Sequence, residues 1–294
     1  MASSMNWEAA RDRLRKLREE QHRCSDEVVS LWEDVLCANS YRLGDELWMV
    51  HEQVCIAALD CGNKDVAMMN LHALQEQFPN SMRVRRLRGL FFESQENYDK
   101  ALKIYDAILD IDETNTLIRK RKIAILKAKD DIRGAIKELN VYVERFMSDY
   151  EAWMELCDLY LQEQDYTKAA FCLEELIMSN PHSHLYHEKY AEIKYTQGGI
   201  ENMCTARRYF AQSLKLNPNN MRALYGLFLS ASNVASSKSK DAKTKKDNIK
   251  YAAWAAEQIT KQYKEVARKK EVDTSSQLTS ILHMMDEIQI TQTS

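Results

Sequence analysis

The sequence predicts an all-α protein built as a solenoid of paired antiparallel helices. Four alanines recur at one constant spacing, at Ala67, Ala101, Ala135 and Ala169. Two of the three prolines, Pro79 and Pro181, follow one of these alanines at an equal distance. The period of about 34 residues places a small residue at one position and a helix-ending residue at another, which indicates stacked helix–turn–helix repeats. Only 7 glycines occur in 294 residues, so few turns are expected beyond those that join helices.

The amino-terminal part precedes the repeats. Residues 1–47 are expected to form two lead-in helices within 6–38, with Ser25 capping the second, followed by a turn around Gly44. The first residues, 1–23, are charged where a signal peptide would be apolar. No apolar run approaches the roughly 18 residues that a membrane-spanning helix needs. We therefore expect a soluble protein.

Six units follow over positions 48–264. Their expected bounds are 48–81, 82–115, 116–149, 150–182, 183–220 and a degenerate 221–264. The fifth unit is longer than the four before it, because Pro218 follows Pro181 at more than one period. We assign the surplus to a lengthened turn at 197–200, which contains Gly198 and Gly199.

The sixth unit is interrupted by a basic stretch. Residues 236–250 hold six lysines and two aspartates, and we expect a flexible loop over 236–246 before a second helix resumes near Asn248. Residues 265–294 should form a linker and a capping helix that covers the exposed end of the stack, with an apolar face of Leu278, Ile281, Leu282, Met285 and Ile288.

Composition argues against several classes of function. The 41 basic residues nearly balance the 44 acidic ones, so no net field favours a nucleic-acid partner. Seven cysteines, without metal-like spacing, indicate reduced thiols. Three histidines cluster within 181–187, but no fourth ligand accompanies them, so a polar turn is a better interpretation than a metal site. No phosphate-binding loop or nucleophile motif occurs. We predict no enzyme activity, no cofactor, no metal and no catalytic residue.

Five tryptophans are interpreted as packing residues. They lie at helical spacing among apolar neighbours, at Trp7, Trp32, Trp48, Trp153 and Trp254. An aromatic platform for stacking a ligand is the less favoured alternative.

Within each unit the residue pattern resembles the tetratricopeptide repeat family. With the small residue at position 20, the unit from Tyr150 has aromatic or aliphatic residues at positions 4, 7, 11 and 24, namely Trp153, Leu156, Tyr160 and Leu173. The resemblance implies a tetratricopeptide-repeat solenoid, a right-handed superhelix of antiparallel helix pairs. It also implies that positions 2, 5, 9 and 12 of each first helix line a concave groove.

The charged residues at these positions are the candidate partner-binding set. They are Arg83, Arg86, Glu93, Lys120, Lys127, Glu151 and Asp158. The order predicts a groove that changes from basic to acidic, complementary to a charged partner segment. The alternative is a solvated face without a ligand. The carboxylate clamp of chaperone adaptors in this family is not reproduced, because its last two positions carry Glu151 and Glu155 instead of cations.

Several segments resemble one family in particular. RKRKIAI at 119–125, KAAFCLEEL at 168–176, KYTQGG at 194–199, RYFAQSLKLN at 208–217, AKTKKDN at 242–248 and QITQ at 289–292 are similar to the family of second subunits of the endoplasmic reticulum (ER) membrane protein complex. That resemblance implies a peripheral, non-catalytic scaffold on the cytoplasmic side of the ER membrane. It would form a hetero-oligomer with membrane and cytosolic subunits, and would support the insertion of tail-anchored and multi-pass membrane proteins.

Two alternatives remain open from the residues. The chain could instead be a free-standing adaptor that binds peptides in the cytosol. The basic loop could be a solvated linker, or its lysines could contact anionic lipid headgroups or a partner. These lysines are Lys238, Lys240, Lys243, Lys245 and Lys246.

Overall fold

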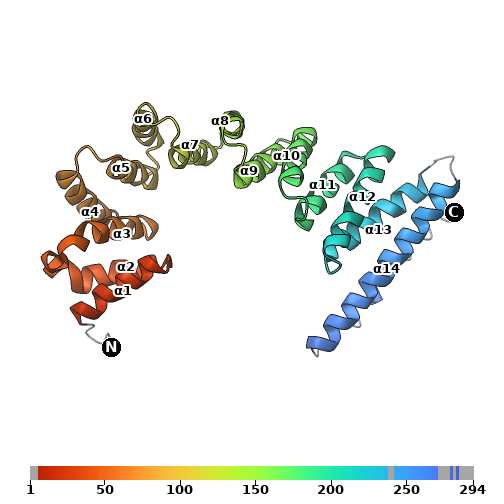
Figure 1. Ribbon diagram of the computed structural model, residues 1–294, viewed down its shortest axis with the longest axis horizontal. Coiled ribbons are helices and arrows are strands. Elements are labelled where there is room, and N and C mark those ends of the chain that lie inside the picture. Colours follow the sequence, from red (N-terminus) through yellow and green to blue (C-terminus); the bar gives the residue numbers. More distant parts are fainter. Residues whose placement is uncertain (1–5, 238–241, 271–278, 281–282, 285–294) are drawn as a thin grey trace. The chain divides into compact units, whose positions relative to one another are not determined.

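The computed structural model describes residues 6–237, 242–270, 279–280 and 283–284. All regular structure in these residues is helical (Figure 1). The chain divides into two compact units, Met1–Asp131 and Ile132–Ser294. All five residues of the predicted capping face, Leu278, Ile281, Leu282, Met285 and Ile288, lie outside the described residues.

The amino-terminal segment contains more helical turns than the two helices predicted. Helices α1 (Trp7–Glu19) and α2 (Ser25–Leu31) are followed by a π-helical turn, η1 (Trp32–Leu36), and by 3₁₀ structure, η2 (Cys37–Glu46). Ser25 is not the cap of α2. The capping position belongs to Cys24, and the Ser25 hydroxyl instead donates a hydrogen bond to Asp60 at 2.8 Å.

Five further helices complete the first unit: α3 (Leu47–Asp60), α4 (Lys64–Gln77), α5 (Met82–Ser94), α6 (Tyr98–Leu109) and α7 (Thr116–Ala128). Helix α3 packs against α4, and α5 against α6. An asparagine precedes α4, α6 and α7, and its side-chain oxygen accepts a hydrogen bond from a backbone N–H of the first turn. These caps explain why the helices begin where they do.

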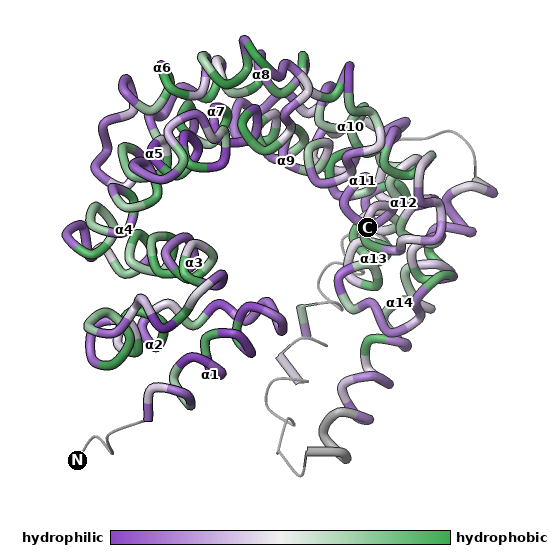
Figure 2. The backbone as a smooth tube through the Cα atoms, turned by 60° about the vertical axis from the view of Figure 1, so that its left-hand side comes forward, coloured by the Kyte–Doolittle hydropathy of each residue, from purple (hydrophilic) through white to green (hydrophobic). Residues whose placement is uncertain are grey.

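The second unit contains seven helices among its described residues: α8 (Ile132–Arg145), α9 (Tyr150–Gln162), α10 (Tyr166–Ser179), α11 (His184–Gln197), α12 (Ile200–Leu216), α13 (Met221–Ser236) and α14 (Ala242–Lys270). Asp149, Asp165 and Asn220 cap α9, α10 and α13 in the same way. Figure 2 shows hydrophilic and hydrophobic residues alternating along the helices, as expected when one stripe of each helix packs against its neighbours.

The repeat period corresponds to a packing position. All four periodic alanines are fully buried, and so is Ala206 of the fifth repeat. The two helices of a pair also approach closely at Gly89 of α5, which faces α6. A Cβ atom added there would lie 2.2 Å from the ring of Tyr105 on α6. The absence of a side chain at Gly89 therefore lets α5 and α6 approach closely.

Two departures from the regular repeat differ from expectation. Helices α11 and α12 are joined by only Gly198 and Gly199, both at positive φ. The surplus lies in α12, which has 17 residues where α10 has 14. In the sixth repeat, α14 begins at Ala242, ahead of the expected start near Asn248. The amino-terminal lysines of α14 therefore belong to a helix and not to a flexible loop.

Candidate functional site

The first helices of the repeats carry the predicted partner-binding residues. In the first unit, α3, α5 and α7 line a cavity of about 370 Å³. Leu90, Ala124 and Ile125 supply apolar surface, and Glu93 and Arg121 supply opposite charges. A concave surface that combines apolar and charged groups is the usual character of a site that accepts a peptide side chain.

Glu93 is held by two neighbours in this cavity. Arg121 on α7 donates from Nε to Glu93 Oε1 at 3.1 Å and from a second nitrogen to Oε2. The Tyr105 hydroxyl donates to the same Oε1 at 2.5 Å. Burial, together with this carboxylate, raises the pKa of Tyr105 well above its ordinary value. Burial alone would lower the pKa of Arg121, but its hydrogen bond to Glu93 and the charge of that carboxylate outweigh burial, and the net shift is upward.

Arg83 and Arg86 share one carboxylate. Arg83 Nε donates to Glu52 Oε1 on α3 at 2.7 Å, and an Arg86 nitrogen lies 3.6 Å from the same oxygen. The Arg83 side chain is 70% exposed, whereas that of Glu52 is only 12% exposed. Two arginines and one glutamate leave a net charge of +1 here. The start of the predicted basic stretch is therefore less basic than α5 alone suggests.

The remaining predicted residues lie on α7 and α9. Lys120 is half-buried and Lys127 exposed on α7, while Glu151 and Asp158 are exposed on α9. Asp158 accepts a hydrogen bond from Lys189 Nζ of α11 at 2.5 Å.

The next pair of first helices is joined in the same way. Arg222 of α13 lies 2.7 Å from Glu192 and 3.2 Å from Glu188, both on α11. Both carboxylates are less exposed than the arginine that they hold. Arg222 therefore links α13 to α11 through two carboxylates, whereas Arg83 links α5 to α3 through one.

These contacts form a series that sequence reasoning missed. Within each unit, cations and carboxylates on consecutive first helices pair across 28 to 31 residues. The members of these pairs that were not predicted as site residues are Glu52, Arg121, Lys189, Glu192 and Arg222. One signal in the sequence could have revealed these residues. Opposite charges recur slightly less than one repeat apart, and consecutive first helices of a solenoid lie side by side.

The basic stretch is only partly described. Lys243, Lys245 and Lys246 lie in the first two turns of α14, and all three are exposed. Lys238 and Lys240 lie outside the described residues. A lysine cluster near a helix N-terminus is not favoured by the helix dipole, so the dipole does not explain its position.

The histidine cluster has a local structural role. His187 is buried, its Nε2 lies 2.9 Å from the Pro181 carbonyl oxygen, and its ring stacks on Tyr209 with centroids 5.8 Å apart. His184 lies 3.2 Å from the side-chain nitrogen of Asn217. In the part of the chain that the structure describes, no three metal-ligating side chains form a group that could hold a metal ion.

The tryptophans do not all pack in the core. Trp32 is fully buried, and Trp48 packs against Phe78 with centroids 5.6 Å apart. Trp254 on α14, however, has 47% of its surface exposed. Its interpretation as a packing residue is therefore wrong.

Comparisons with known proteins agree with this repeat architecture. The family profile described as "EMC2 TPR-like repeat domain" matches residues 66–216. The chain is 53% identical to ER membrane protein complex subunit 2-A of Xenopus laevis, over 98% of this chain and 97% of that protein. It is 31% identical to ER membrane protein complex subunit 2 of Dictyostelium discoideum, over 88% and 85% of the two chains.

A solved structure supports the fold alone. The C-terminal part of a TPR repeat-containing protein from Cytophaga hutchinsonii aligns with a TM-score of 0.60 at 13% identity, covering 87% of this chain and 95% of that one. Among the helices described, none combines the length and the apolarity that crossing a bilayer requires.

Proposed function

Because the chain belongs to the ER membrane protein complex subunit 2 family, we propose that it is a non-enzymatic scaffold subunit of that complex. The observation that carries this proposal is the match to relatives of that name along nearly the whole chain. The helical repeats support it, since solenoids present extended surfaces to partners and each repeat adds a further contact surface.

Within the complex, we place the chain on the cytoplasmic side of the ER membrane, bridging membrane subunits to cytosolic ones. In this position it would support energy-independent insertion of tail-anchored and multi-pass membrane proteins. It would act by holding other subunits in place, with no cofactor and no nucleic-acid partner.

Co-purification and an insertion assay test this role together. Tagged full-length chain is expected to recover the other subunits from detergent-solubilised ER membranes. Cells depleted of the chain should lose insertion of a tail-anchored reporter and regain it on re-expression. Recovery of the chain as a monomer, or normal insertion after depletion, would contradict the proposal.

Partner binding is proposed for the predicted first-helix residues. Charge reversal at Arg83, Arg86 and Lys120 should weaken co-purification of a partner subunit. Because Arg83 and Arg86 also contact Glu52, thermal unfolding must be measured on the same variant. Arg88→Glu, an exposed reversal on the same helix, is the matched control. Full recovery of the complex with the triple variant would refute this interface.

The lysines of 238–246 are proposed to contact anionic lipid headgroups or a partner subunit. Each lysine near an anionic surface can contribute about 1 kcal/mol. Flotation with phosphatidylserine vesicles, compared with neutral vesicles, tests the lipid contact. Lys243→Glu, Lys245→Glu and Lys246→Glu together should abolish any flotation that these lysines cause. Equal flotation with both vesicle types would exclude the lipid contact.

A free-standing peptide-binding adaptor is the second candidate. It is favoured by the cavity between α3, α5 and α7, which combines apolar surface with the Glu93–Arg121 pair. Size-exclusion chromatography of native cytosolic and detergent extracts separates the two functions. A large membrane-derived assembly supports the scaffold, and a cytosolic monomer supports the adaptor.

A further inference from the structure

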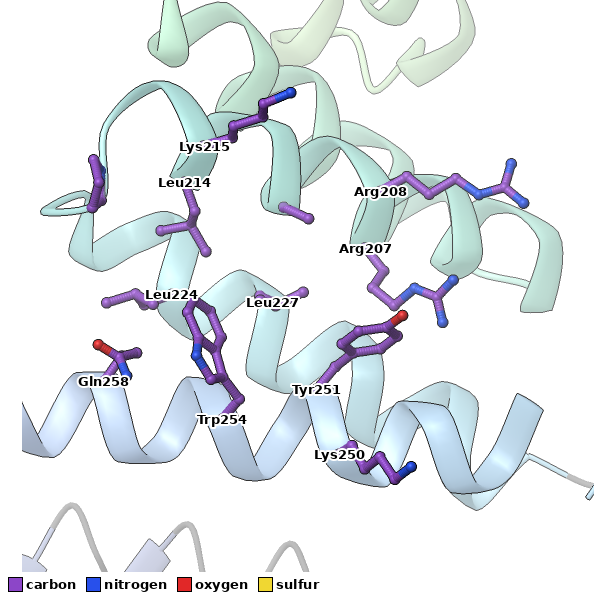
Figure 3. A pocket seen from close by; sticks show the side chains of 12 residues that line it. Arg207, Arg208, Leu214, Lys215, Leu224, Leu227, Lys250, Tyr251, Trp254 and Gln258 are labelled. Carbon is purple, nitrogen blue, oxygen red and sulfur yellow. The ribbon is translucent and has the colours of Figure 1, made fainter. Parts of the chain in front are cut away.

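A second concave surface lies in the carboxy-terminal part of the second unit. Helices α12, α13 and α14 line a cavity of about 760 Å³ (Figure 3). Its floor is made of leucines that belong to the core, Leu214 of α12 and Leu224 and Leu227 of α13. The cavity is therefore built on well-packed helices and is lined by apolar surface.

Two aromatic side chains of α14 line this cavity while remaining open to solvent. Tyr251 is 46% exposed and Trp254 is 47% exposed. The residues that α14 buries in the core are Ala252, Ala255 and Ile259, which lie on another side of the helix. Figure 3 shows both rings projecting from α14 towards the space lined by α12 and α13. Exposed tryptophan and tyrosine beside an apolar cavity are the residues that dominate binding energy at protein interfaces.

The charges around the cavity all have the same sign. Four cations line it: Arg207, Arg208, Lys215 and Lys250. No carboxylate belongs to the lining, and none of the four forms an ion pair within the described part of the chain. The first helices behave differently, because their arginines Arg83, Arg121 and Arg222 each face a glutamate.

One of these cations is held in position. Arg207 donates to Asn248 Oδ1 at 2.5 Å, and its guanidinium carbon lies 5.2 Å from the centre of the Tyr251 ring. Both contacts are with neutral groups, so the positive charge stays uncompensated. A preorganised cation of this kind loses less side-chain entropy when it binds a carboxylate.

We propose that this cavity docks an acidic amphipathic segment of a partner protein. Apolar side chains of the segment would enter the cavity between Trp254 and Leu227, and its aspartates or glutamates would contact the four cations. Charge complementarity selects the acidic segment, and the apolar floor selects one with an apolar face. A bilayer surface fits less well, since its phosphates lie in a plane while these cations surround a concave apolar surface. The inference does not rest on the proposed scaffold role, because it follows from the cavity alone.

Peptide binding to the purified full-length chain tests this inference. The probe is a fluorescein-labelled helical peptide of about five turns, with leucine and phenylalanine on one face and glutamate elsewhere. A matched peptide carries lysine in place of glutamate. Fluorescence anisotropy should show that the glutamate peptide binds at least about tenfold more tightly than the lysine peptide, and that added salt weakens its binding.

Variants then locate the binding site. Trp254→Ala, and separately Arg207→Glu with Lys250→Glu, should each weaken binding of the glutamate peptide by about tenfold or more. Lys261→Glu removes an exposed cation from the same helix outside the cavity and should leave binding unchanged. Circular dichroism of each variant checks that the helices are retained. Trp254 and Lys250 are exposed, so the fold should tolerate their replacement; Arg207 is half-buried and hydrogen-bonded to Asn248, so Lys250→Glu alone is the fallback if the double variant loses helix.

Four results would overturn the inference. The first is equal affinity for the two peptides, and the second is an equal loss of binding with Lys261→Glu. The third is displacement of the peptide by phosphatidylserine vesicles in a manner that depends on Trp254, which would make the cavity a lipid site. The fourth is tighter peptide binding by a chain ending at Lys270, which would make residues 271–294 of the same chain the occupant.

Discussion

The carboxylate of Glu52 on α3 accepts a hydrogen bond from Arg83 Nε on α5 at 2.7 Å. Glu52 is nearly enclosed, whereas Arg83 is largely exposed, and Arg86 also approaches the same oxygen. A single carboxylate thus joins two consecutive first helices of the solenoid. The pair is the first of a series that continues at Glu93–Arg121, Asp158–Lys189 and Glu192–Arg222.

Glu52→Gln is expected to cost more stability than Arg83→Gln. The glutamine variant at position 52 leaves Arg86 without its carboxylate, and Arg86 Nε is already buried without a partner in the described structure. We expect a loss of about 1–2 kcal/mol for Glu52→Gln, and less than about 1 kcal/mol for the exposed Arg83→Gln. Urea unfolding of both variants measures this, with Glu144→Gln on the surface of α8 as the control. The reverse order would show that Arg86 does not depend on Glu52.

Gly89→Ala should destabilise the first unit. The added methyl group would overlap the Tyr105 ring, which is packed at zero exposure between α5 and α6. Overpacking of this kind costs about 1–3 kcal/mol. Thermal unfolding of the purified chain measures the loss. In a Tyr105→Leu background the same glycine change should cost much less, and an equal cost in both backgrounds would exclude the ring as the cause.

Low pH should weaken the first unit through His51. Its ring contacts those of Trp32 and Trp48 and lies 2.7 Å from Asn70 Oδ1. Burial lowers the pKa of His51 below its ordinary 6.5, although the hydrogen bond with Asn70 acts in the opposite direction. The unfolded chain therefore binds the proton more readily, and stability is lost as pH falls below about 6.5.

Urea midpoints at pH 7.5 and pH 5.5 test this sign. The midpoint should fall at the lower pH in the native chain and fall less in His51→Gln, which can keep a hydrogen bond with Asn70. His72→Gln alters an exposed histidine of α4 and should preserve the native pH dependence. An unchanged pH dependence in His51→Gln would contradict the assignment.

Three thiols should resist alkylation until the chain unfolds. Burial raises the pKa of Cys55 to about 12, that of Cys157 to about 11 and that of Cys172 to about 12. The thiolate is the reactive form, and these side chains are also inaccessible. Iodoacetamide at pH 8 followed by peptide mass spectrometry should label exposed Cys61 before these three, although desolvation and the hydrogen bond to Asp26 raise the pKa of its thiol as well. Labelling of Cys55 as fast as Cys61 in the folded chain would show that α3 opens locally.

Much of the fold could be predicted because its determinants are local and periodic. The buried alanines at one position of each repeat follow from residue type and spacing, whereas the one predicted cap, Ser25, is wrong because Cys24 occupies the capping position of α2. The prediction for the fifth repeat failed because a pair of glycines is compatible with a long turn and also with a two-residue connection. Gly198 and Gly199 suggested a long turn, but the extra residues extend α12, because a short two-glycine connection at positive φ suffices.

The candidate site was less predictable for a physical reason. Residue spacing places a side chain on a helix face, but it does not show which opposite charge on the next helix lies within reach. From the sequence alone, Arg83 and Arg86 form a basic surface without a partner. In the structure both arginines contact Glu52. Trp254 looked like a core residue because its helical spacing resembles that of its buried neighbours.

The sequence by itself thus determined the repeat and the buried positions that recur with it, since these depend on backbone geometry and on the spacing of small and apolar residues. Only the tertiary structure decided which charges neutralise one another and which remain unpaired. Ion pairing depends on whether a side chain on one helix can contact a side chain on another helix distant in sequence. The cavity beside Trp254 forms only where α12, α13 and α14 pack together. That distinction separates the compensated first-helix arginines from the uncompensated cations around Trp254.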